Sequence, residues 1–397
     1  MGWEFNIGAR LHRRLLDQEL NVKASRKYEP DELIASHKLL KRLLDTPDAF
    51  LTHLRQMAGE LILSFTYGID VLPSDDPYIT LAEEALHTLV SAAIPGKYLV
   101  DTFPILKHIP IWFPGAGFKR QAREWRKLAR SMLELPFLET KRQMESGIAR
   151  SSFTADRLNG LKDTNSAYQE DHIKSTAATM YLGGADTTVS TLGTFILAML
   201  ANPEAQKKAQ AEIDGVTAGE TLPTFADRDS LPYVSAIVKE VLRWKNVTPF
   251  GAPRLLTVED EYRGYRLPAR SLIIGSTWSI LHDPIIYPDP HTFKPERFLL
   301  NGKLNPAIRD PEAAFGFGRR KCPGRHMATS STWITIASVL ATFDINKAVD
   351  ADTGRVIEPT YAYFQGVVNM PLPFKCSIKP RSTQAVTLVK GAAASSQ

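Results

Sequence analysis

The segment Phe315–Gly324, FGFGRRKCPG, decides how the rest of the chain is interpreted. It places Cys322 between glycines on a loop, directly before an apolar pattern with helical spacing. Glycines let the backbone approach a flat ligand closely and let N–H groups point at a sulfur atom. The flanking Arg319, Arg320 and Lys321 are expected to favour the thiolate over the thiol. Because a lone cysteine is more often a buried structural residue, the role of Cys322 depends on the pattern around it.

The composition of the whole chain is that of an ordinary globular protein. Of the 397 residues, 44% are apolar and 23% are charged, which excludes a disordered chain, a collagen and a coiled coil. The net charge of +5 is spread along the chain and gives little support for nucleic-acid binding. The two cysteines, Cys322 and Cys376, are too few for a disulfide scaffold or a four-cysteine zinc site and suit a reducing compartment.

Apolar periodicity predicts helix after helix in the first half of the chain, interrupted by an expected loop at Ser151–Ser166. Proline and glycine become dense from Pro249 to Pro323, where short strand-like segments include a hairpin candidate at Glu259–Pro268. The pattern predicts a mainly α domain over residues 1–381, with a small β-rich part near its C-terminus. The small, polar tail over residues 382–397 is expected to be disordered.

Neither a signal peptide nor a membrane span is expected from the sequence. Met1–Arg10 has no apolar core of the kind that signal peptides carry. The most apolar stretch, Thr187–Leu200, has 14 residues, whereas a span needs roughly 20. A buried core helix is therefore the favoured interpretation of that stretch.

The pattern Phe-x-x-Gly-x-Arg-x-Cys-x-Gly is matched in Phe315–Gly324 at all of its fixed positions. Ordinary residue frequencies give this match a chance on the order of 1 in 10,000 in a chain of this size. The segment resembles the haem-binding loop of the cytochrome P450 superfamily, the haem-thiolate monooxygenases. The resemblance implies the P450 fold, haem b (iron protoporphyrin IX) as cofactor and Cys322 as the axial ligand of the haem iron. It also implies that Phe315, Gly318 and Gly324 shape the cofactor loop and that Arg320 pairs with a haem propionate.

Two further motifs follow in the order typical of that family. Glu240-Val-Leu-Arg243 alone would most often be a solvated surface pair on a helix. With Pro295-Glu-Arg-Phe298, the resemblance implies a buried network in which Arg297 joins Glu240 and Arg243 and holds the haem loop. Such a network survives burial only if every charge is paired. These three residues are therefore assigned to structural support.

The segment Gly183–Thr188, GGADTT, lies inside the long apolar helix expected over His172–Leu200. Glycines and threonines are poor helix formers, and the Thr187 hydroxyl can bond the carbonyl of Gly183, four residues back. A packing notch between helices is one interpretation. The resemblance implies another, in which Asp186 and Thr187 form the acid–alcohol pair of a catalytic proton relay.

Weaker matches concern the haem propionates and the start of the chain. Arg254 stands where the family often has a residue that reaches a propionate, although an edge-strand arginine is an equal alternative. Arg13 occupies the arginine position of a Trp-x-x-x-Arg helix, but Ala9 stands where the tryptophan is expected, and Trp3 does not restore the spacing. The chain thus resembles an N-terminally truncated member, without the first strands and the membrane anchor. Cys376 is expected to be a strand residue without chemistry.

The resemblance implies a monooxygenase that inserts one oxygen atom of O2 into a hydrophobic organic substrate, by analogy in fungal secondary metabolism. A flavoprotein reductase would supply electrons from NADPH. The basic face formed by Arg319, Lys321 and Arg325 has two interpretations: it binds an acidic surface of the reductase, or its charges only balance those of the haem propionates. Full-length members sit on the cytosolic face of the endoplasmic reticulum, whereas the chain as written is expected to be soluble and cytoplasmic. The alternatives are a truncated, haem-poor or inactive remnant and a non-oxygenating haem-thiolate enzyme, against which the intact Asp186 and Thr187 argue.

Overall fold

A computed structural model describes residues 7–94, 96–161, 166–364 and 366–395. The chain divides into two compact units, one made by residues up to 57 and from 187 onward, the other by residues 58–186. Two helices, α4 (Phe50–Tyr67) and α9 (Ser166–Ala201), run across the division. The chain is mainly helical and its strands all follow residue 253 in the described part, which confirms the predicted fold class.

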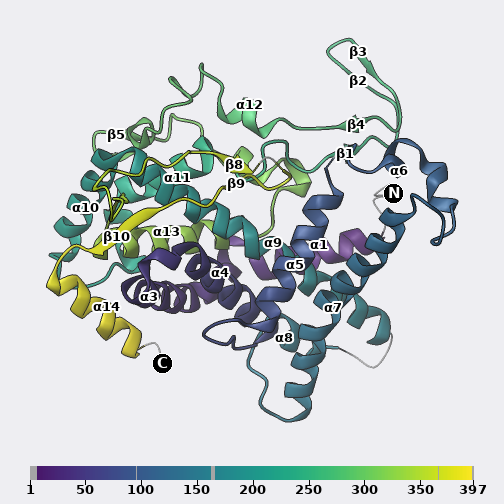
Figure 1. Ribbon diagram of the computed structural model, residues 1–397, viewed down its shortest axis with the longest axis horizontal. Coiled ribbons are helices and arrows are strands. Elements are labelled where there is room, and N and C mark those ends of the chain that lie inside the picture. Colours follow the sequence, from purple (N-terminus) through teal and green to yellow (C-terminus); the bar gives the residue numbers. More distant parts are fainter. Residues whose placement is uncertain (1–6, 95, 162–165, 365, 396–397) are drawn as a thin grey trace. The chain divides into compact units, whose positions relative to one another are not determined.

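The larger unit is organised around α13 (Arg325–Thr342), in which every residue from 330 to 340 is buried. The buried hydroxyls of Ser330, Ser331, Thr335 and Thr342 donate to carbonyls one turn back, as Thr335 does to Ser331 at 2.7 Å, so their polarity is satisfied inside the core. Among the described residues, the Ser338 hydroxyl is buried without a hydrogen-bond partner. In Figure 1, α13 runs beside its neighbours α3, α10 and α11, which contact it. The other helices of this unit are α1 (Ile7–Leu20), α2 (Val22–Ser25), α3 (Glu29–Asp45), α10 (Pro203–Thr217), α11 (Pro232–Trp244), α12 (Thr277–Leu281) and α14 (Thr383–Ser395).

The strands of the larger unit are short and form antiparallel pairs. The pairs are β1 (Arg254–Leu255) with β4 (Leu272–Ile273), β2 (Asp260–Tyr262) with β3 (Tyr265–Leu267), β5 (Leu299–Leu300) with β6 (Lys303–Leu304), β7 (Phe343–Lys347) with β10 (Cys376–Pro380), and β8 (Tyr363–Phe364) with β9 (Met370–Pro371). The β2–β3 hairpin lies inside the predicted Glu259–Pro268 segment. It turns through Arg263 and Gly264, both with positive φ.

The smaller unit packs α5 (Pro77–Ala92) against α7 (Gly117–Glu145) and includes the short helices α6 (Leu99–Thr102) and α8 (Phe153–Asn159). Tyr67 and Tyr181 meet edge to face inside it, with ring centroids 6.0 Å apart. The Thr140 hydroxyl donates to the Tyr67 carbonyl at 2.9 Å. These contacts fix the end of α4 that belongs to this unit.

Two sequence-based expectations are corrected by the structure. Part of the expected loop at residues 151–166 is α8, which begins because the Ser152 hydroxyl accepts a hydrogen bond from the Ala155 N–H and because Phe153 is fully buried. Residues 162–165 of that expected loop lie outside the described residues. The tail expected to be disordered forms α14, whose Ala385 and Val389 are buried. Alanine is the best helix former, and α14 lies against α3.

Among the residues that the structure describes, one helix is long and apolar enough to cross a membrane, over Tyr168–Ala201. Two thirds of its most apolar window, 67%, is buried in the protein. Burial of this extent is typical of a core helix, as expected from the sequence of Thr187–Leu200.

A buried carboxyl group joins α3 to α13. Glu32 is 1% exposed. One of its oxygens accepts a hydrogen bond from the Ser330 hydroxyl at 2.8 Å, and the other has no hydrogen-bond partner. Burial raises the pKa of Glu32 from 4.5 to about 8, against the opposing effect of the Ser330 hydrogen bond. The folded protein therefore holds a proton that the unfolded chain has already released at neutral pH.

We expect Glu32 to make the protein less stable as the pH rises. A folded-state pKa above the unfolded value gives stability that is fully present below pH 4.5 and lost as the pH rises toward about 8. Because of Glu32, the free energy of unfolding should fall by roughly 1.4 kcal/mol per pH unit across this window. In Glu32→Gln, which has no titratable group at this position, this fall should disappear. Urea unfolding at pH 5 and pH 8.5 measures it, with Asp101→Asn, at an exposed position of α6, as control. An equal pH dependence in Glu32→Gln and the unmodified protein would contradict a neutral buried Glu32.

Candidate functional site

The Cys322 loop runs from the short helix η6 (Glu312–Phe315) through η7 (Gly318–Arg320) into the start of α13. The backbone N–H of Cys322 donates to the carbonyl of Phe315 at 2.7 Å, which closes the loop. Gly316 and Gly318 have φ values of 80° and 56°, a region that glycine adopts without strain. The turn therefore depends on glycine at both positions.

The electrostatics at the sulfur differ from the sequence-based expectation. Burial raises the pKa of the Cys322 thiol, and the backbone N–H of Gly324 opposes this rise. The positive charges that also oppose it belong to Arg13 and Arg325, rather than to the predicted Arg319, Arg320 and Lys321. A metal that binds this sulfur must therefore displace a proton from it.

Three arginines from distant parts of the sequence gather at this loop. Arg13 in α1 donates to the carbonyl of Lys321 at 2.5 Å. Arg254 in β1 donates to the carbonyl of Arg320 at 3.4 Å. Burial lowers the pKa of Arg254, and the nearby charges of Arg320 and Arg13 lower it further. Like charges that crowd in this way are stabilised when an anion binds among them.

The donor set at the loop fits the haem that the sequence predicts. A sulfur ligand, Cys322, lies on a loop whose glycine-rich turn leaves little side-chain bulk near it. A cluster of positive charge lies beside it, formed by the guanidinium groups of Arg13, Arg254 and Arg320. Such a cluster can bind a group that carries more than one carboxylate. Both features belong to the larger unit.

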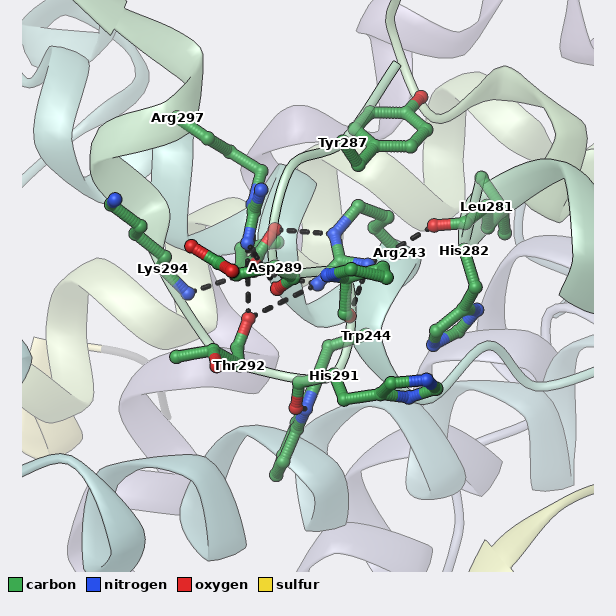
Figure 2. A network of polar contacts seen from close by, with 12 residues as sticks. Arg243, Trp244, Leu281, His282, Tyr287, Asp289, His291, Thr292, Lys294 and Arg297 are labelled. Carbon is green, nitrogen blue, oxygen red and sulfur yellow. Dashed lines mark hydrogen bonds and ion pairs between the residues drawn. The ribbon is translucent and has the colours of Figure 1, made fainter. Parts of the chain in front are cut away.

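The predicted Glu240, Arg243 and Arg297 lie together in a buried network (Figure 2). Glu240 and Arg243 are fully buried and form a bidentate pair, with N–O distances of 2.7 and 2.8 Å. Arg297 Nε reaches the same carboxylate at 3.1 Å, and the backbone N–H of Lys294 donates to it at 2.8 Å. The carboxylate therefore anchors α11 to the segment that carries Arg297.

Two guanidinium groups face one carboxylate, and backbone carbonyls satisfy the rest of their donors. Arg243 donates to the carbonyls of Leu281 (3.0 Å), Pro290 (2.8 Å) and Thr292 (3.3 Å). Arg297 donates to those of Pro288, Asp289 and Thr292 at 2.5–3.1 Å. Figure 2 shows Leu281, Asp289 and Thr292 around the guanidinium groups of Arg243 and Arg297. The network thus holds the irregular segment 281–297 in place.

Asp186 and Thr187 are consecutive residues of α9, and the division between the two units falls between them. Both are partly exposed. The Thr187 carbonyl accepts a hydrogen bond from the Thr191 hydroxyl at 2.9 Å. Within the smaller unit, a Cβ at Gly184 would lie 2.5 Å from Ile62 Cδ1, so this glycine does form a packing notch. The role of Asp186 and Thr187 in a proton relay stays a prediction.

The basic face proposed from the sequence is largely turned inward. Arg325 donates to the Cys322 carbonyl at 3.0 Å, and Lys321 pairs with Glu312. Arg319 alone of these cations is exposed. Sequence reasoning missed the inward role of Arg325, although its place directly after the cysteine loop is a signal that could have suggested it.

The remaining sequence candidates lie apart from these contacts. Cys376 is buried in β10, and burial raises its pKa to about 12, as suits a thiol without chemistry. Ala9 lies in α1, and Trp3 lies outside the described residues. The backbone donor of Lys294 in the network was not predicted, because a main-chain N–H leaves no signature in the sequence.

Comparison with known proteins gives consistent findings. The pattern of the cytochrome P450 family matches residues 8–377. A cytochrome P450 monooxygenase of Armillaria gallica is 44% identical over 98% of this chain and 78% of its own length. Tryptamine 4-monooxygenase of Psilocybe cyanescens is 40% identical over 98% of this chain and 79% of its own. A solved zebrafish cytochrome P450 with abiraterone shares the fold, with a TM-score of 0.72, 22% identity and coverage of 96% and 83% of the two chains.

Proposed function

Because the chain belongs to the cytochrome P450 family and its relatives are monooxygenases, it is an oxidoreductase of that class, and we propose that it oxidises a hydrophobic organic molecule of fungal secondary metabolism. The observation that carries the proposal is the loop on which the half-buried Cys322 lies beside three crowded arginines. Relatives from several fungi, one of them named for its action on tryptamine, support the metabolic setting.

The bound group in this proposal is haem b. Haem ligated by a cysteine thiolate supplies the oxygen chemistry, because the thiolate pushes electron density onto the iron and favours O–O cleavage. Cys322 provides the ligand, and the Gly324 N–H and the charges of Arg13 and Arg325 favour its deprotonated form. Arg254 and Arg320, with Arg13, hold the propionates by charge-assisted hydrogen bonds.

Asp186 and Thr187 are proposed to handle protons. Breaking an O–O bond requires protons, and the buried Met180, Tyr181 and Val189 make much of the surrounding helix apolar. The Thr187 hydroxyl can both donate and accept a hydrogen bond and can hold a water. The Asp186 carboxylate, one residue before it and partly exposed, can exchange protons with solvent.

The proposed partners follow from the same chemistry. Two electrons come from NADPH through a flavoprotein reductase, and the second substrate is O2. The proposed location is the cytosolic face of the endoplasmic reticulum membrane.

Isotopically labelled dioxygen tests the proposed reaction. The haem-loaded protein is incubated with a reductase, NADPH and a panel of apolar compounds that begins with tryptamine. We expect one labelled oxygen atom in the product of at least one compound, and labelled water as the other product. Product oxygen that comes from water, or a rearranged product without added oxygen, would contradict monooxygenation.

Thr187→Ala is expected to uncouple NADPH oxidation from product formation. Loss of the hydroxyl removes a proton donor, so NADPH oxidation should continue while product per NADPH falls by roughly tenfold or more and hydrogen peroxide rises. Haem content should not change. The matched control is Thr188→Ala, one residue further along α9, which should stay coupled. Coupling that is equal in both variants would leave only the packing-notch interpretation of this segment.

A further inference from the structure

A pocket lies in the larger unit, between α11, α13 and the segment 303–315 that leads to the Cys322 loop. Its volume is about 600 Å³, within the range of sites for small molecules. Phe315 and Arg325 border both this pocket and the Cys322 loop, but none of Arg13, Arg254 and Arg320 lines it, so the pocket lies apart from the arginine cluster described above. The pocket is therefore a candidate site for a second ligand.

One side of this pocket is apolar and rigid. Trp333 is fully buried, and its indole N–H donates to the Ser235 hydroxyl at 3.1 Å, which fixes the ring. Val238 and Leu242 of α11 and Leu304 of β6 complete the apolar lining. Of these side chains, Leu242 is partly exposed and Leu304 is exposed, so they can contact an aromatic or aliphatic body.

The charged residues of the wall leave an excess of cations. The lining holds four cations against three carboxylates, namely Arg228, Lys239, Lys303 and Arg325 against Asp229, Asp310 and Glu312. Asp310 already pairs with Lys239, and Glu312 already pairs with Lys321, which is not part of the lining. The third carboxylate, Asp229, is exposed. The charge available to a ligand is thus mainly positive.

Arg228 is the cation best placed to receive an anion. Its guanidinium carbon lies 5.7 Å from the centre of the Trp333 ring. Among the residues that the structure describes, its side chain has no hydrogen bond and no ion pair within 4.0 Å. Burial lowers its pKa, against the opposing charges of Glu29, Glu32 and Asp229. His326 also lines the pocket, and its Nε2 is buried without a hydrogen-bond partner.

We propose that this pocket binds a small organic anion, with a carboxylate, sulfonate or phosphate ester on Arg228 and an apolar body against Leu242 and Leu304. A guanidinium group offers paired N–H donors that match such an anion in a bidentate geometry. The ring below keeps the guanidinium in place by a cation–π contact. The bound anion supplies the acceptors that Arg228 lacks.

The probe for this proposal is 8-anilinonaphthalene-1-sulfonate, which joins a sulfonate to an aromatic body. Equilibrium dialysis against the purified chain, with haem content measured in parallel, gives the affinity and the stoichiometry. We expect an Arg228-dependent site that Arg228→Gln weakens at least tenfold. The neutral analogue N-phenyl-1-naphthylamine should bind at least tenfold more weakly than the sulfonate. The control Arg263→Gln, at the exposed turn of the β2–β3 hairpin, should bind as the unmodified protein does.

A second variant keeps the test valid if Arg228→Gln folds poorly. Leu304→Trp changes an exposed side chain at the rim of the pocket and should exclude the probe by size while it leaves Arg228 intact. Sulfonate affinity that is equal in Arg228→Gln and the unmodified protein, or unaffected by Leu304→Trp, would overturn the proposal. Equal affinity for the neutral analogue would overturn the anion as the ligand class.

Discussion

Replacing Cys322 by serine is expected to abolish the thiolate signature of the haem complex completely. A serine hydroxyl keeps the size of the side chain but cannot supply a soft sulfur donor to the iron. In the structure, the Cys322 N–H bond to Phe315 involves only the backbone, so the loop itself should persist in the variant. The low-spin electron paramagnetic resonance spectrum of the oxidised, haem-loaded protein measures the loss.

Cys376→Ser is the matched control, because it removes the one other cysteine of the chain. Cys376 lies in β10 and is buried there, so this variant should lose some stability but keep the thiolate signature. A thiolate-type spectrum that survives in Cys322→Ser and disappears in Cys376→Ser would show that the two cysteines have been assigned the wrong way round.

Replacing Glu240 by alanine is expected to have the largest effect on stability. Glu240 is the single carboxylate between two guanidinium groups, and it and Arg243 are fully buried. Its loss leaves two buried positive charges without a counterion, which costs roughly 3–5 kcal/mol. Because the network anchors the segment 281–297 to α11, we expect the variant to purify with little or no haem. Urea unfolding and the haem content per chain measure both effects.

Glu204→Ala provides the comparison with an ordinary surface pair. Glu204 pairs with Lys207 three residues later on α10, at 3.0 Å, and its side chain is 75% exposed. Removal of such a pair should change stability by less than about 1 kcal/mol. If Glu240→Ala were as stable and as rich in haem as Glu204→Ala, the network would have no supporting role.

The sequence predicted the long elements well because their apolar periodicity is strong. The long apolar helix expected over His172–Leu200 appears within α9 (Ser166–Ala201), which begins six residues earlier and ends one residue later. The expected loop at residues 151–166 failed because Phe153 is an isolated apolar residue whose burial depends on tertiary packing. The tail was mistaken for disorder because small residues signal mobility in isolation, whereas Ala385 here packs in the core.

The chemistry of the site could be predicted in part. Glycines and arginines around Cys322 carry a distinctive pattern, and Glu240 and Arg297 each lie in a motif. These two residues are 57 positions apart in the chain. Their contact could be predicted only from the resemblance to a family, because no pattern within either motif indicates it. Backbone acceptors such as the Thr292 carbonyl, and the unpartnered Arg228, leave no trace in the sequence, because they depend on how distant segments fold together.

The carbon monoxide difference spectrum of the reduced, unmodified protein reports on the ligand of the iron. If the Cys322 sulfur binds the iron of a haem held by Arg13, Arg254 and Arg320, the spectrum should show a thiolate-type Soret band from one haem per chain. A band typical of nitrogen-ligated haem, or no haem-dependent band from a folded protein, would contradict this ligation.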